Sequence, residues 1–261
     1  MFNGPYFKQL MKSNIKFMLL FTVVLCIFLT VMSSVFTEEA MGELNSAVQG
    51  TAAANILTGN GTLIGFMSNS FYALMAIVFP MVYAIFVGNR LIAEKVDRGS
   101  MAGLLSTPVT RLQVAGSGAI YLLFSLALMW LLTTGVGIAA AEHFQPGALD
   151  FDTFALMNVG AFLYHAAISS ICFCASCVFN TSKHSLMVGA GVPLAFFVIS
   201  LFVKLSEDLD ILRYLTLNTL FDTESILEGT GYGVDFAILI GITVVLYTVG
   251  LVVFHKKDLP I

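Results

Sequence analysis

Six long apolar stretches, none of which contains Asp, Glu, Lys or Arg, alternate with polar connections along the chain. They cover residues 17–36, 68–89, 112–141, 153–182, 185–203 and 236–254. A hydrocarbon layer about 30 Å thick needs roughly 20 helical residues to cross it, so each stretch is long enough to span once. Because helices satisfy their own backbone polar groups in lipid, the pattern predicts an all-α membrane protein with six transmembrane helices.

Composition agrees with this prediction. The chain is 58% hydrophobic and 11% charged, with a mean hydropathy of +0.91, whereas soluble domains are about 25% charged. Its 261 residues fit one transmembrane domain over 1–261 and leave no room for a soluble catalytic domain. The apolar stretches also lack the carboxylates that ion-driven transporters generally keep inside the membrane.

The charged residues are sorted between the two sides of the predicted bundle. Carboxylates gather in the connections 37–67, 142–152 and 204–235, where Lys204 and Arg213 are the only Lys or Arg residues. The positive-inside rule therefore places both termini in the cytoplasm, a topology that requires an even number of spans. The remaining basic residues lie on the terminal side: Lys8, Lys12, Lys16, Arg90, Lys95, Arg98, Arg111, Lys183, Lys256 and Lys257.

The N-terminal segment 1–16 has an amphipathic pattern. Phe7, Leu10, Met11 and Asn14 recur at helical spacing, with lysines on the other side. The pattern predicts a short helix lying in the membrane interface, and a frayed polar arm is the alternative. The apolar run that follows is longer than a signal-peptide core and no A-x-A-like site follows it, so we expect it to be retained.

The connection 204–235, before the last apolar stretch, also carries helix signals. Ser206 precedes two acidic residues, and leucine recurs at every third residue from 209 to 215. This pattern favours one or two short outer helices, ended by Gly229, Gly231 and Gly233.

Two polar features inside the apolar stretches have structural interpretations that we favour over functional ones. Cys172 and Cys174 would point about 200° apart on a helix, so the C-x-C-x-x-C run fits packing rather than a metal site. His165 and Asn158 are explained by hydrogen bonds across a helix interface, although polar groups within membranes also mark functional sites.

The sequence offers no catalytic constellation. It contains no Gly-Lys pair and therefore no nucleotide-binding P-loop. Ser117, within Gly-Ser-Gly, has no histidine at the same depth. We expect no catalytic residues, no metal or cofactor held by this chain, and no nucleic-acid partner.

The connection 90–111 is the most charged one on the terminal side, yet it also carries an apolar stripe. Met101, Leu104 and Leu105 lie one helical turn apart, and Pro108 fits the first turn of the following helix. A short helix with an apolar stripe at the cytoplasmic face favours docking of another protein. A solvated loop is the alternative.

This connection also carries a family resemblance. An acidic residue, Gly99-Ser100 and then Leu104-Leu105-Ser106-Thr107-Pro108 resemble the segment after the second span in permeases of ABC type-2 exporters, in which Thr is commoner than Ser at position 100. The tail from Phe254 to Ile261 resembles that family's ending. Within the family the chain looks most similar to permeases that export bacitracin-type antibiotics and phenol-soluble modulins.

The resemblance implies a non-catalytic permease in a bacterial cytoplasmic membrane. It implies pairing with a second permease, expected to be an identical copy, and two copies of a separate cytoplasmic ATPase that binds Mg-ATP. The implied coupling residues are Glu94, Gly99, Met101, Leu104, Leu105, Pro108 and Arg111.

Aromatic residues indicate which class of molecule such a permease would transport. Tyr72, Phe79, Tyr83 and Phe86 fall within about 60° of one helical face, and the resemblance implies that this helix and the fifth span, with Phe196 and Phe197, border the cavity. Such an uncharged wall suits amphipathic or hydrophobic peptides; packing against a neighbouring helix or facing lipid is the alternative. A lipid or drug exporter, and a membrane immunity or sensor protein that binds peptide without pumping it, remain alternative functions.

Overall fold

The structure, a computed structural model, describes residues 2–37, 61–203, 212 and 214–259. Within these residues the secondary structure is helical and includes no β-strand. Six segments are long and apolar enough to span a membrane, which confirms the predicted all-α membrane protein. They are Gly4–Val35, Leu63–Asp97, Arg111–Phe144, Phe151–Val178, Ser182–Val203 and Tyr232–Lys256.

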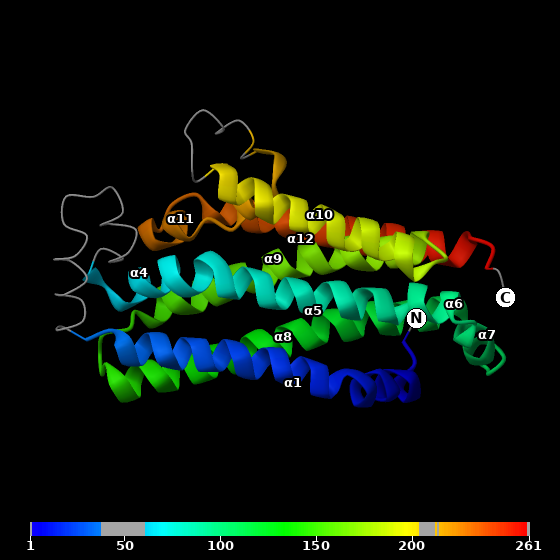
Figure 1. Cartoon of the computed structure of the whole chain (residues 1–261), viewed down its shortest axis with the longest axis horizontal. Coiled ribbons are helices and arrows are strands. Elements are labelled where there is room, and N and C mark those ends of the chain that lie inside the picture. The colour runs from blue at the N-terminus through cyan, green and yellow to red at the C-terminus, as the bar shows by residue number, and fades with distance from the viewer. Residues whose placement is uncertain (1, 38–60, 204–211, 213, 260–261) are drawn as a thin grey trace.

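The spanning helices run side by side along the long axis of the molecule (Figure 1). The two chain ends and the short helices α6 (Ala93–Asp97) and α7 (Ser100–Leu105) lie at one end, which we call the basic end. Helices α4 (Leu63–Met67) and α11 (Thr223–Glu228) lie at the opposite, acidic end. Both termini therefore lie at the same end of the bundle, as the charge pattern predicts.

Helix α9 (Phe151–Val178) is the centre of the bundle. Within its most apolar stretch 72% of residues are buried, compared with 11% in α10 (Ser182–Val203). Around it pack α5 (Ala76–Leu91), α8 (Arg111–Phe144), α10 and α12 (Tyr232–Lys256). The fold is thus a ring of helices around α9, with α1 (Gly4–Val35) packed on α8.

Glycines let three helices approach α9 closely. A Cβ at Gly88 of α5 would lie 2.9 Å from the Cβ of Cys172. A Cβ at Gly189 of α10 or at Gly250 of α12 would lie 3.3 Å from the Cα of Cys172 or Cys174, respectively. Small residues at such crossings are typical of helix packing in membranes. The cysteines are free thiols at these crossings, and the Cys172 thiol bonds the carbonyl oxygen of Gly189 at 3.1 Å.

Both polar residues of α9 that the sequence analysis singles out contact the second span. His165 contacts the carbonyl oxygen of Ile77 on α5 through Nε2 at 3.1 Å, which confirms a hydrogen bond across a helix interface. The Asn158 amide donates to the Phe154 carbonyl of its own helix at 2.8 Å, and the Asn158 side chain also lies beside the Tyr72 hydroxyl of the second span, across a helix interface.

The N-terminal residues differ from the prediction. Residues 4–16 do not form a helix of their own but continue without a break into the first span as α1 (Figure 1). The reason is that no helix-breaking residue separates the two parts, and the face carrying Tyr6, Leu10 and Asn14 is buried in the protein instead of being left for lipid.

Helix ends at the acidic side also differ in detail. The second span begins earlier than predicted, with α4 followed by the π-helix η2 (Ser68–Met75). The 3₁₀ helix η4 (Leu217–Leu220) and α11 confirm short outer helices, although the predicted start at Ser206 lies outside the described residues. Gly229 ends α11 in the left-handed conformation, but Gly233 lies inside α12, so the last helix starts at Tyr232 rather than at 236.

Candidate functional site

The connection 90–111, which we call the coupling segment, consists of two short helices joined by a tight turn. Helix α5 ends where Ile92 leaves helical geometry, with φ −129° and ψ −68°. Helix α6 follows directly, and Gly99 turns the chain into α7 with φ +70°. Residues with a Cβ rarely adopt this φ, so glycine is required at the turn.

The end of the coupling segment corrects one prediction. Pro108 lies in the exposed stretch before the next helix, not in its first turn. Helix α8 begins at Arg111 because Thr110 and Gln113 form a capping box, in which each side chain bonds the other's backbone N–H. This reciprocal cap fixes the start of the helix three residues after the proline.

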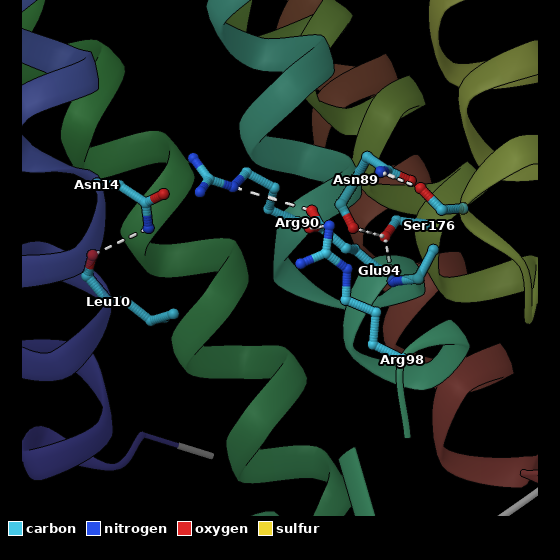
Figure 2. A network of polar contacts seen from close by, with 9 residues as sticks. Leu10, Asn14, Asn89, Arg90, Glu94, Arg98 and Ser176 are labelled. Atoms are coloured by element: carbon cyan, nitrogen blue, oxygen red, sulfur yellow. Dashed lines mark hydrogen bonds and ion pairs between the residues drawn. The ribbon is translucent and has the colours of Figure 1, made fainter. Parts of the chain in front are cut away.

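The end of α5 and helix α6 are fastened to α9 and α10 by four hydrogen bonds, and Figure 2 shows those made by Asn89 and Ser176. The buried Ser176 hydroxyl accepts from the backbone N–H of Ala93 at 2.9 Å and donates to the Asn89 carbonyl at 3.4 Å. The Asn89 amide donates to the Ser182 hydroxyl at 2.7 Å. At the other end of α6, the Asp97 carboxylate accepts from the Ser182 backbone N–H at 3.2 Å.

These contacts provide hydrogen-bond partners for backbone groups that the helices themselves leave unpaired. Such groups occur at the bend between α5 and α6 and at the start of α10. The first N–H groups of a helix have no partner within it, so Ser176 supplies one for α6 and Asp97 one for α10. We name Asn89, Asp97, Ser176 and Ser182 the anchor cluster. Sequence analysis missed it; the available signal was polar residues at the ends of otherwise apolar stretches.

Glu94 lies between two arginines on the surface of α6 (Figure 2). Its carboxylate is 2.9 Å from the Arg98 guanidinium and 3.8 Å from that of Arg90, each one helical turn away. The Glu94 side chain is 21% exposed, compared with 47% for Arg90 and 75% for Arg98. The structure therefore gives Glu94 partners within its own chain, and these exposed pairs are worth about 0–1 kcal/mol each.

This charged ridge separates two clefts at the basic end. One, of about 230 Å³, faces α1 and includes Gln9, Ser13 and Lys95. The other, of about 500 Å³, lies toward α10 and combines Phe17, Phe86 and Leu186 with the charged ridge. We call the second one the amphipathic cleft.

The N-terminal helix is also fastened to the coupling segment. Lys95 donates to the Tyr6 hydroxyl at 2.6 Å, and its ammonium lies 4.8 Å from the centre of the Tyr6 ring. The Asn3 backbone N–H donates to the Ser117 hydroxyl of α8 at 2.9 Å. Neither Tyr6 nor Lys95 is among the predicted site residues.

The predicted apolar stripe of α7 is split. Met101 is fully buried, whereas Leu104 and Leu105 are half-buried and pack at the edge of the core. The two leucines thus remain partly available to a partner, and Met101 serves to hold α7 to the bundle.

Arg111, the last predicted coupling residue, holds the C-terminal tail. Its guanidinium donates to the Lys257 carbonyl at 2.8 Å. The Lys257 ammonium donates to the carbonyls of Cys177, Val178 and Phe179 at 2.7–3.3 Å, at the C-terminal end of α9. Burial lowers the pKa of Lys257, because it penalises the charged form.

The aromatic stripe does not form one wall within the chain. Tyr83 is fully buried, with its ring against Phe17 and Phe21 of α1 and its hydroxyl 3.4 Å from that of Tyr121. Phe79 also contacts Phe21. These two aromatic residues therefore pack against a neighbouring helix, because α1 carries a complementary set of phenylalanines.

The other predicted wall residues lie in separate places. Phe86 is 49% exposed and lines the amphipathic cleft. Tyr72 is buried near the acidic end, where its ring stacks on Trp130 at 6.5 Å. Phe196 and Phe197 are half-buried on α10. The structure thus leaves Phe86 as the stripe residue most accessible to a ligand.

One family of known proteins matches almost the whole chain. A family model described as ABC-2 family transporter protein matches residues 7–259. No individual curated protein matches the chain closely enough to count as a relative. Among the described residues no group of three His, Cys, Asp or Glu side chains is arranged to hold a metal ion.

Proposed function

The chain belongs to the ABC-2 transporter family, and from this premise we propose that it is the permease of an ATP-driven exporter of amphipathic or hydrophobic peptides. Its transmembrane architecture is that of a membrane component, and the sequence holds no P-loop. ATP hydrolysis then belongs to a separate cytoplasmic ATPase that binds Mg-ATP.

The observation that carries the proposal is the anchor cluster. A segment that receives force from a partner must be exposed on one side and firmly joined to spanning helices on the other. Leu104 and Leu105 supply partly exposed apolar surface, while Ser176 and Asp97 join α6 to α9 and α10. Displacement of α7 by an ATPase would therefore move the ends of these two helices.

Proline residues give two of these helices places to bend. Pro80 lies inside α5 and Pro193 inside α10, and proline removes a backbone hydrogen bond from a helix interior. The cytoplasmic halves of α5 and α10 flank the amphipathic cleft through Phe86 and Leu186. Movement of the anchored ends would open or close this cleft.

The amphipathic cleft supports the choice of cargo. Its apolar side is formed by Phe17, Phe86 and Leu186, and its polar side by Arg90, Glu94 and Arg98. An amphipathic helix placed there would meet apolar surface on one face and charges on the other, so neither face would be left without partners. Export from the bacterial cytoplasm or inner leaflet would protect the cell from membrane-active peptides.

Assembly completes the proposal. One chain offers one coupling segment, and ABC ATPases act as a closed pair, so we propose two identical permeases with two ATPases. Native mass measurement of the purified complex tests this stoichiometry. An active complex with a single permease would contradict it.

The test of function is ATPase activity in reconstituted vesicles containing the complex. An amphipathic helical peptide should stimulate hydrolysis and accumulate on the far side, and Phe86→Ala should weaken stimulation because it removes the exposed ring from the cleft. Ile120→Ala, at an exposed apolar residue of α8 outside the cleft, is the control. Stimulation by a lipid or hydrophobic drug but not by peptide would select another exporter. Peptide binding without ATPase association would select an immunity or sensor protein.

A further inference from the structure

A second cavity lies at the acidic end, away from the coupling segment. Its volume is about 290 Å³, and it is bordered by η2, the end of α10 and the segment from Thr216 to Glu224. The size suits a small headgroup or one long side chain rather than a whole peptide. We call it the acidic-end pocket.

Two buried hydroxyls at this pocket, those of Ser68 and Tyr72, form no well-aligned hydrogen bond among the described residues. Their side chains are 1% and 0% exposed, and the Tyr72 hydroxyl has only the Asn158 side chain beside it. Both belong to η2, and π-helices are frequent at functional sites. Leaving a buried hydroxyl unpaired costs about 1–3 kcal/mol, so such groups call for a ligand or water.

The unpaired groups near this pocket favour a ligand that donates hydrogen bonds. Hydroxyl groups accept hydrogen bonds as well as donate them, and the carbonyl oxygen of a side-chain amide only accepts them. Asn218 and the carboxylates of Asp222 and Glu224 also line the cavity, and the lining residues that the structure describes include no Lys or Arg. Trp130, which stacks on Tyr72, contributes one unpaired N–H and so is a lone donor beside several acceptors.

The rest of the lining is apolar. Ala73, Ile77 and Leu201 border the cavity, and Leu201 is an exposed residue of α10. A ligand with a hydrocarbon portion would therefore keep that portion against apolar surface while its head reaches the hydroxyls and carboxylates.

From this arrangement we propose that the acidic-end pocket binds a primary ammonium group carried on an apolar chain. An ammonium has three donors and no acceptor, which matches the acceptors of the pocket, and its charge is matched by Asp222 and Glu224. The ammonium comes either from a small alkylamine-like amphiphile or from a lysine of an amphipathic peptide. The second source rests on the proposed function, and the first does not.

The single tryptophan of the chain makes the site measurable. Trp130 is its only tryptophan, 2% exposed and stacked on Tyr72. In nanodiscs containing the full-length protein, bromododecylammonium should quench its fluorescence saturably. Bromododecanol and bromododecanoate, which share the tail, should quench weakly and without saturation.

Variants locate the binding. Tyr72→Phe and Glu224→Gln should each weaken ammonium binding roughly tenfold, the change that corresponds to about 1.4 kcal/mol. Glu142→Gln, at an exposed carboxylate of the same end outside the pocket, should bind as the wild type does. Tyr247→Phe removes a buried hydroxyl that bonds Ser169 elsewhere, and it should also leave binding unchanged.

Competition separates the two sources. A lysine-bearing amphipathic peptide should displace bromododecylammonium, and its norleucine analogue should not. If neither peptide displaces bromododecylammonium, the pocket binds small amphiphiles. Peptide export would then be tested only by the ATPase and accumulation assay of the proposed function. Equal quenching by all three headgroups, or wild-type binding in Tyr72→Phe and Glu224→Gln, would overturn the proposal.

Discussion

Removing the Ser176 hydroxyl should loosen the join between α6 and α9. This hydroxyl is fully buried and accepts from the Ala93 N–H at 2.9 Å, and Ala93 is also fully buried. In Ser176→Ala the N–H loses its acceptor without any change in the neighbouring packing. A buried donor left unpaired costs about 1–3 kcal/mol.

A penalty of this size shifts a local opening equilibrium by roughly 5- to 150-fold, since 1.4 kcal/mol corresponds to a factor of ten. Opening of α6 exposes its amides to solvent, so hydrogen exchange measures the effect directly. In Ser176→Ala, amides from Ala93 to Asp97 should exchange at least about fivefold faster, while the middle of α9 keeps its protection.

Ser170→Ala is the matched control. Ser170 is equally buried on the same helix, but among the described residues its hydroxyl bonds only the Ala167 carbonyl, one turn back. It should leave exchange in α6 unchanged. Unchanged exchange in Ser176→Ala, or equal acceleration in both variants, would refute the reasoning that the anchor cluster fastens the coupling segment.

Two further predictions concern stability. Gly250→Leu should lower Tm in detergent, because even a Cβ there would lie 3.3 Å from the Cα of Cys174. Gly241→Leu should leave Tm unchanged, because nothing lies within 4 Å of a Cβ at that position. An equal loss of Tm in both variants would contradict close packing of α12 on α9. Lys257→Met should lower Tm, because it removes three hydrogen bonds at the end of α9. Lys256→Met, at an exposed residue, should leave Tm unchanged. A wild-type Tm in both variants would show that Lys257 does not stabilise the end of α9.

The spans could be predicted from sequence because lipid imposes one strong requirement. A stretch of 20 apolar residues without charge has few alternatives to a spanning helix, so all six were found. Their ends were predicted less well. Several local signals for a helix start compete there. Pro108 fits the first turn of a helix, but the capping box of Thr110 and Gln113 determines where α8 begins.

The residues of the candidate site could be predicted from the sequence only in part, for a different reason. Helical spacing places Phe79 and Tyr83 on one face but does not say which helix covers that face, and α1 covers it. The anchor cluster joins residues 85 to 93 positions apart, such as Asn89 with Ser182, and no local pattern links them. Tertiary packing alone brings these residues together.

The central claim is that an ATPase docks on the coupling segment. Leu104→Asp combined with Leu105→Asp places two charges on its partly exposed apolar surface. Burying such charges at an interface is unfavourable, so the variant should assemble in the membrane but lose ATPase binding. Leu215→Asp, at an exposed leucine of the acidic end, is the control.

The most direct measurement is the amount of ATPase that co-purifies with each permease variant, together with its hydrolysis rate. The account predicts normal binding and stimulation for the wild type and Leu215→Asp, and at least a tenfold loss of both for the double variant, equivalent to about 1.4 kcal/mol. Wild-type binding and stimulation in a folded double variant would contradict it.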